Sequence, residues 1–314
     1  MEANNLIIAI AQVVTILVVS PLMSGLLIIY RQWLSGQKGG YVLQFYCNLR
    51  KLICTKKLQT SQYNIWFTIV GPGLSFLSLI MAATMLPLFT HETLGHLFLG
   101  DDLFLLFGLL LLSKFFQSMV SYDAPACFST TGSGRVMMVH STTEPIFFLI
   151  FLALALNSED TSIYTILSLE MKIDLIPLLF ILAALYLNIL MECGRIPYDN
   201  PATHLELTMI EKGARIERSG IDLALAEWGE SIKILILILF ISGISTHTLQ
   251  IVLRYNHLFG LINIFFIFVL FPLITAFLEI TIPRYRVGDL PKQSYVSLGL
   301  TLIAVGYIIV YNSK

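Results

Sequence analysis

The chain has 314 residues, of which 56% are hydrophobic and only 12% are charged, and its mean hydropathy is +0.81. Soluble domains carry about 25% charged residues, so this composition excludes an ordinary soluble domain. The net charge of −1 gives no indication of a nucleic-acid partner. Apolar runs of about 20 residues are long enough to cross a bilayer. Because a backbone in lipid must satisfy its own hydrogen bonds, the chain is predicted to be a polytopic bundle of transmembrane helices.

Eight apolar runs are predicted to be membrane spans. In chain order they cover residues 6–30, 65–89, 103–121, 137–157, 173–191, 231–251, 258–279 and 294–311. Residues 1–314 are therefore expected to form a single all-α integral membrane domain. The sequence shows no internal repeat, which argues against an inverted-repeat transporter. The start, Met1-Glu2-Ala3-Asn4-Asn5, lacks a basic segment, so no cleavable signal peptide is expected.

The loops between the predicted spans differ in charge. Residues 31–64 contain six cations and no acid. Arg135 and the 192–230 loop fall on the same side, whereas the opposite loops carry acids such as Asp101 and Glu159. The positive-inside rule places the basic loops in the cytoplasm and both termini outside. A bacterial cytoplasmic (inner) membrane is the expected location.

The basic first loop contains apolar residues at helical spacing between Val42 and Lys57. Cations such as Arg50 and Lys51 occupy the remaining positions. This pattern predicts a short amphipathic helix that lies in the membrane interface. The same cations could also anchor the loop to anionic lipid.

Residues 191–233 gather charge between the fifth and sixth spans. They hold eight of the chain's 20 acids, together with five cations. Asp199 or Asn200 is placed to cap the start of a following helix. Residues 202–217 are predicted to form that helix, with Glu211 and Arg215 paired four residues apart. The fifth-to-sixth span loop is therefore expected to contain a second cytoplasmic amphipathic helix.

The run Glu192-Cys193-Gly194-Arg195-Ile196-Pro197-Tyr198-Asp199-Asn200-Pro201, continuing to Glu206-Leu207, resembles the signature of the H-type subunit of respiratory complex I. The stretch from Asn200 to Ile210 is more similar to the version in formate hydrogenlyase and other membrane-bound nickel–iron hydrogenases. Lys38-Gly39-Gly40 departs from the complex I pattern, in which Arg-x-Gly-Pro is usual. The departure leaves open whether quinone binds here.

The resemblance implies a membrane subunit that docks a hydrophilic redox arm and carries a carboxylate proton or coupling path to the membrane arm. Its implied partners are hydrogenase-like and iron–sulfur subunits on the cytoplasmic side and antiporter-like membrane subunits. Iron–sulfur clusters and a nickel–iron centre, or a flavin, would belong to those partners. One alternative is the H-type subunit of NADH–quinone oxidoreductase, which lines a quinone chamber. Another is an autonomous ion transporter.

No cofactor or metal is expected in this chain itself. Its four cysteines, Cys47, Cys54, Cys127 and Cys193, form no C-x-x-C pair. The Walker loop, the Rossmann glycine fingerprint and the haem motif are also missing from the sequence. Any redox centre is therefore expected in partner chains.

Carboxylates carry the predicted function. A charged residue deep in a span costs about 2.5–3.5 kcal/mol on insertion scales, so Glu144 is expected to face a polar cavity or a partner. Its structural alternative is a protonated carboxyl that only joins helices. Glu279 and Arg284–Arg286 are expected to anchor the seventh span at the interface.

The predicted proton or coupling path consists of Glu144, Glu192, Arg195, Asp199, Glu206, Asp222, Glu227, Glu230 and Lys233. The predicted docking surface or chamber mouth consists of Lys38, Gln44, Lys51, Asp123 and Arg135.

Overall fold

The computed structural model describes residues 2–37, 39–56, 65–87, 100–124, 126–167, 175–196, 198–199, 209–253, 265–283, 285 and 289–312. Within these ranges the chain is helical apart from turns and one isolated bridge between Asp102 and Ser162. The helices are α1 (Glu2–Leu34), α2 (Gln44–Cys54), α3 (Ile65–Thr84), α5 (Leu103–Asp123), α6 (Cys127–Ser158), α7 (Ile163–Leu167), α8 (Leu175–Glu192), α9 (Glu211–Ala214), α10 (Gly220–Leu253), the π-helix η1 (Phe266–Leu270), α12 (Phe271–Thr281) and α13 (Pro291–Asn312).

Each predicted span coincides with a helix over the described residues, except that the helix of the second span ends at Thr84, before the described residues 85–87. The matching helices are α1, α3, α5, α6, α8, α10, η1 with α12, and α13. Among the described residues, five helices are long and apolar enough to cross a membrane: Ile7–Leu34, Leu103–Asp123, Cys127–Ser158, Leu175–Glu192 and Pro291–Val310. Val70–Thr84 and Phe266–Thr281 are shorter apolar helices. The prediction of an all-α polytopic membrane bundle is confirmed.

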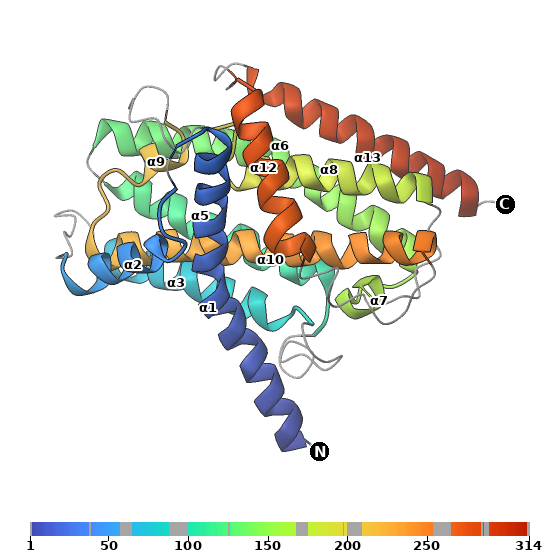
Figure 1. The fold of residues 1–314 in the computed structure, drawn as a ribbon, viewed down its shortest axis with the longest axis horizontal. Coiled ribbons are helices and arrows are strands. Elements are labelled where there is room, and N and C mark those ends of the chain that lie inside the picture. Colours follow the sequence, from blue (N-terminus) through green and yellow to red (C-terminus); the bar gives the residue numbers. More distant parts are fainter. Residues whose placement is uncertain are drawn as a thin grey trace.

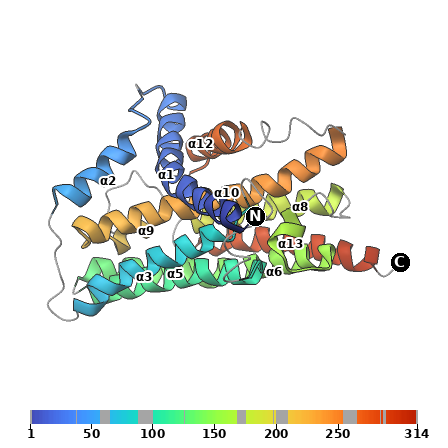
Figure 2. The same ribbon diagram turned by 90° about the horizontal axis from the view of Figure 1, so that it is seen from below.

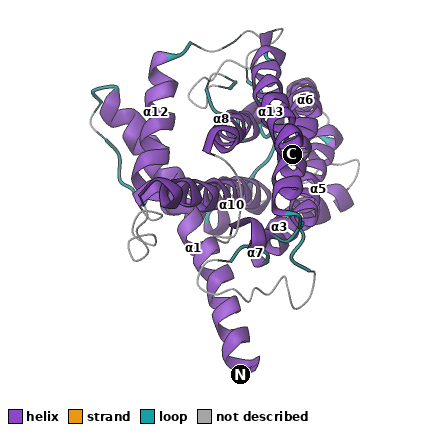
Figure 3. Cartoon of the chain, turned by 90° about the vertical axis from the view of Figure 1, so that its right-hand side faces the viewer, coloured by secondary structure: helices purple, strands orange, loops and turns teal. Residues whose placement is uncertain are grey.

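The long helices form layers around α10. Helices α3, α5 and α6 lie on one side of α10, and α1, α2 and α12 lie on the other (Figure 2). Viewed along the bundle, α6 and α8 are seen nearly end-on, whereas α1 and α12 run across the view (Figure 3). The short helices α2 and α9 lie at the same end of the bundle (Figure 1). That end carries most of the charge described below.

Helix α1 contains a proline that opens its backbone toward neighbouring helices. Pro21 has no N–H to donate to the carbonyl of Leu17. Trp228 of α10 fills this position, because its Nε1 donates to the Leu17 oxygen at 3.1 Å. Tyr46 of α2 donates in the same way to the carbonyl of Val18. These bonds fix α1 and α2 against α10 where α1 lacks a hydrogen bond of its own.

Helix α6 approaches α9 so closely that only glycine fits at the contact. A Cβ at Gly132 would lie 2.5 Å from the nitrogen of Ala214 and 2.6 Å from the carbonyl carbon of Gly213. Ser129, one turn earlier on α6, donates to the Ala214 carbonyl at 3.1 Å. The contact therefore sets the position of α9, which carries Glu211.

We expect Gly132→Ala to destabilise the chain by about 1–3 kcal/mol, because the added methyl group would push α9 away. The measurement is the thermal unfolding midpoint of the purified protein in detergent. Gly108→Ala on α5 is the matched control, since a Cβ there meets nothing within 4 Å. The control should be neutral or slightly stabilising. Equal midpoints for the two variants would contradict the close contact.

The two predicted loop helices differ in outcome. The amphipathic helix of the first loop is confirmed as α2, with Leu49 buried and Arg50 and Lys51 exposed. The predicted 202–217 helix is wrong at both described ends: Met209 and Ile210 are not helical, and α9 ends at Ala214, after which the chain continues in turns. The side chains of Arg215 and Arg218 are drawn to partners on other helices, and these tertiary contacts outweigh local helix propensity. Residues 201–208 lie outside the described part of the chain.

Candidate functional site

The fifth span ends in a buried cluster around Glu192. One carboxylate oxygen of Glu192, Oε1, pairs with the ammonium group of Lys233 on α10. The other oxygen, Oε2, lies 2.9 Å from Nδ1 of His140 on α6. All three side chains are buried, so the partners replace the water that the charges have lost. Helices α6, α8 and α10 are thus joined at this point.

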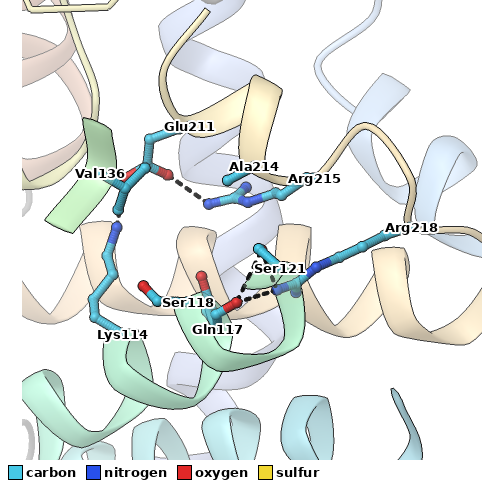
Figure 4. A pocket seen from close by; sticks show the side chains of 9 residues that line it. All are labelled: Lys114, Gln117, Ser118, Ser121, Val136, Glu211, Ala214, Arg215 and Arg218. Atoms are coloured by element: carbon cyan, nitrogen blue, oxygen red, sulfur yellow. Dashed lines mark hydrogen bonds and ion pairs between the residues drawn. The ribbon is translucent and has the colours of Figure 1, made fainter. Parts of the chain in front are cut away.

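A second buried cluster surrounds Glu211 on α9. Its Oε1 lies 2.5 Å from Nζ of Lys114 on α5, and its Oε2 lies 2.6 Å from Nη2 of Arg215 (Figure 4). Arg215 also pairs with Glu230 on α10. Asp199 holds the start of α9, since its Oδ2 accepts the N–H groups of Ile210 and Glu211 at 3.2 and 3.0 Å. The predicted Glu211–Arg215 pair is confirmed. Asp199 binds the start of α9, whereas its cap of a helix that begins at residue 202 stays a prediction, because residues 200–208 lie outside the described part of the chain.

Glu211 is a fixed charge. Burial would raise the pKa of Glu211, but the cations of Lys114 and Arg215 outweigh burial and hold that pKa at about 2. The carboxylate therefore stays ionised at physiological pH. It orders the cations around it and does not exchange protons in this state.

The two clusters are in electrostatic contact. The ammonium group of Lys114 is close enough to that of Lys233 for the two to interact. Lys233 in turn interacts with Glu144, which is half-buried in the middle of α6. The predicted intramembrane carboxylate thus lies within electrostatic reach of the Glu192 cluster.

An open cavity of about 790 Å³ lies beside these clusters. Helices α1, α2, α10 and α12 and the loop after α8 form its walls. Its charged lining residues are Arg31, Arg195, Asp199, Glu211, Lys212, Arg215, Glu227, Glu230 and Glu279. Apolar groups such as Ile28, Phe45 and Leu223 complete the lining. The cavity is therefore a mixed polar and apolar chamber at the charged end of the bundle.

Glu279 is a buried counter-ion of this chamber and not the interface anchor that its sequence position suggested. Its carboxylate lies 3.7 Å from Nε of Arg31 and 3.4 Å from Nη1 of Arg195. The side chain of Glu279 therefore points into the bundle near the end of the seventh span, where cations from α1 and from the signature loop hold it. Residues 284 and 286–288 lie outside the described residues.

The structure gathers most of the predicted path residues at one end of the bundle. Arg195, Asp199, Glu227 and Glu230 line the cavity. Asp222 lies 3.6 Å from Arg218 and is buried. Glu206 lies outside the described residues.

The predicted docking residues are more scattered. Gln44 and Lys51 are exposed on α2, where Gln44 donates to Asn48 at 3.2 Å. Asp123 ends α5, and Arg135 donates to the carbonyl of Met209 at 3.0 Å. The described members of this set do not contribute to the cavity lining. Lys38 lies outside the described residues.

Sequence reasoning missed Lys114 and His140 as site residues. Both are polar groups inside predicted spans, and both are buried against carboxylates in the structure. A titratable residue within an apolar run is a signal of function. That signal was available for both residues, although their partners could not be inferred from it.

Comparison with known proteins places this architecture in a family. A family model described as NADH dehydrogenase matches residues 6–310. Hydrogenase-4 component C of Escherichia coli (strain K12) is 30% identical over 230 residues, which cover 72% of this chain and 71% of that protein. Formate hydrogenlyase subunit 4 of the same organism is 25% identical over 299 residues, covering 93% and 95% of the two chains.

A solved structure shares the fold. A chain of the membrane-bound sulfane sulfur reductase, an archaeal respiratory membrane complex, aligns with a TM-score of 0.72 over 96% of this chain and 99% of that chain. At 15% identity this match supports the fold alone. The sequence matches support more, because they cover the span order and the charged loop together. The chain belongs to the NADH dehydrogenase family and is a complex I-like membrane subunit of the hydrogenase type.

Proposed function

We propose that this chain docks a hydrophilic redox arm and passes its proton or conformational signal into the membrane. One observation carries the proposal: buried charged groups form a row that leads from the cavity toward the middle of α6. From Glu230 the row passes through Arg215, Glu211 and Lys114 to Lys233, which interacts with both Glu192 and Glu144. The two end residues, Glu230 and Glu144, are only partly buried. Charges are expensive to bury, and a continuous row of them is a functional hypothesis by default.

The members of this row have different roles. Glu211 is fixed as an anion, and its neighbours Lys114 and Arg215 are its counter-ions. Glu144 makes no ion pair among the described residues, so a proton can occupy it without leaving a partner charge exposed. Charge movement at the cavity would therefore reach Glu144 through the electrostatic field of Lys233 and Glu192.

The proposed partners follow from the family and from the shape of the charged end. Hydrogenase-like and iron–sulfur subunits would bind on the cytoplasmic side, where α2, α9 and the cavity lie together. Antiporter-like membrane subunits would receive the signal within the bilayer. Iron–sulfur clusters and a nickel–iron centre or a flavin would reside in the soluble partners.

A second candidate is the quinone-binding subunit of an NADH–quinone oxidoreductase. The size of the cavity favours this second candidate, since its volume of about 790 Å³ is within the usual range for small-molecule sites. The many charges that line the cavity favour the hydrogenase type instead. A photoreactive quinone distinguishes them: labelling of Phe45 or Leu223 would support the quinone subunit.

Purification from native membranes tests the proposed function. A tagged chain should bring iron–sulfur and nickel–iron or flavin proteins with it in fixed ratio. The chain expressed alone should show no visible absorption band and no stoichiometric iron or nickel. Ion transport by the isolated chain in vesicles would point to an autonomous transporter, and a cluster in the isolated chain would contradict the assignment of redox centres to partners.

We also expect the charged end of the bundle to face the cytoplasm of the inner membrane, with both termini outside. Lys212 is exposed beside the cavity, so Lys212→Cys should react with an impermeant maleimide only in inverted vesicles. The exposed cysteines Cys47, Cys54 and Cys127 must first be replaced. Glu159→Cys, at the opposite end of α6, is the matched control and should react in intact cells. Labelling at position 212 from outside would reverse the topology.

A further inference from the structure

His140 lies where charged side chains from several helices meet. Its imidazole is buried, with 3% of the residue exposed. Nδ1 lies 2.9 Å from Oε2 of Glu192, but out of line for a hydrogen bond. Lys114, Glu211 and Lys233 are also close enough to act on the ring electrostatically. A small rotation of the ring would complete the hydrogen bond to Glu192.

The position of His140 on α6 connects this cluster with the interior of the membrane. His140 precedes Glu144 by four residues, so the two side chains lie on one face of the helix, a turn apart. Pro145 has no backbone N–H, so the carbonyl of Ser141, which lies between His140 and Glu144 in the chain, lacks its usual helical donor. His140 therefore lies between Glu192 at the end of α8 and Glu144 deeper in the bundle.

The charged groups around the ring balance one another without a proton on His140. Lys233 holds Glu192, and Lys114 holds Glu211, so two cations and two anions balance while the imidazole is neutral. Imidazole is the side chain whose ordinary pKa, about 6.5, lies nearest physiological pH. Helices α7 and α13 also pack on α6, but α7 has no charged residue, and the single one of α13, Lys292, is exposed and paired with Asp289.

We propose that His140 passes protons between Glu144 and Glu192, a step that rests on the proposed function. One ring nitrogen accepts the proton of the Glu144 carboxylic acid, and Nδ1 releases a proton to Oε2 of Glu192. Glu144 becomes a carboxylate, Glu192 becomes a carboxylic acid, and the imidazole is neutral again with its one proton on the other ring nitrogen. The reverse transfer resets the relay, and no electron moves in either direction.

Two substitutions test the relay in the assembled complex. His140→Gln keeps a polar side chain and His140→Met keeps an apolar one of similar volume, and neither titrates. Proton translocation is measured in reconstituted vesicles between pH 5 and pH 8, with subunit content checked in each sample. We expect at least a tenfold lower rate and an altered pH profile, with subunit content unchanged. Asn188→Ala is the matched control, because Asn188 is buried one turn before Glu192 and does not titrate.

Glu144→Gln in the same vesicles distinguishes failure of the His140 relay from failure of the proposed proton path. Normal proton translocation in both His140 variants, with an unchanged pH profile, would overturn the relay. If translocation were slow in Glu144→Gln at the same time, the proposed path would still stand. Normal translocation in Glu144→Gln would overturn both. Loss of assembly in both His140 variants, with Asn188→Ala intact, would make His140 a structural residue and would also overturn the relay.

Discussion

Glu192→Gln should destabilise the folded chain by about 3–5 kcal/mol, the usual loss when one partner of a buried ion pair is removed. Lys233 would then remain buried on α10 without its counter-ion. From the sequence alone, Glu192 is expected to matter for coupling more than for folding. The pair with Lys233 changes that expectation, because it gives the carboxylate a structural role as well.

The double variant Glu192→Gln with Lys233→Met separates charge from packing. Removing both charges leaves no uncompensated ion, so most of the lost stability should return. The measurement is a double-mutant cycle on thermal unfolding in detergent, which isolates the pairwise interaction. A single variant as stable as the parent, or a double variant no better than the single one, would show that the two groups are not a buried pair.

Local sequence signals identified the fold. Apolar runs marked the long helices of the bundle, because lipid exposure and core packing both select hydrophobic residues over whole spans. The five-residue helix α7 was not predicted. The spacing of Val42, Phe45 and Leu49 marked α2 for the same reason. Residues 215–217 were wrongly predicted to be helical. Arg215 and Arg218 take partners on α10 and α5, and no local sequence pattern indicates those contacts.

The site was only partly predictable. The signature led to Glu192 and Asp199, and the charged stretch 191–233 led to Glu230, since these residues lie near one another in the chain. Lys114 and His140 come from other helices and reach the site only through packing. Glu279 was assigned to the interface because it ends a span, yet its side chain is buried against Arg31 and Arg195. Which cation accompanies which acid is thus a property of the tertiary structure.

Glu144→Gln should leave the complex assembled while proton translocation falls at least tenfold, which corresponds to about 1.4 kcal/mol or more. Glutamine keeps the size and hydrogen bonding of the side chain but cannot carry a proton as an acid. Assembly should survive because Glu144 makes no ion pair among the described residues, unlike Glu192. Electron transfer between the soluble partners should persist when translocation fails.

The matched control for Glu144 is Glu217→Gln, since Glu217 is exposed in the turn after α9 and should be insensitive to loss of charge. Both variants are reconstituted in vesicles, and proton uptake, redox activity and subunit content are measured in the same samples. Normal uptake in Glu144→Gln would remove the proton path from this helix. Loss of subunits in that variant would instead make the carboxyl group a structural link between helices, because a coupling residue should leave assembly unchanged.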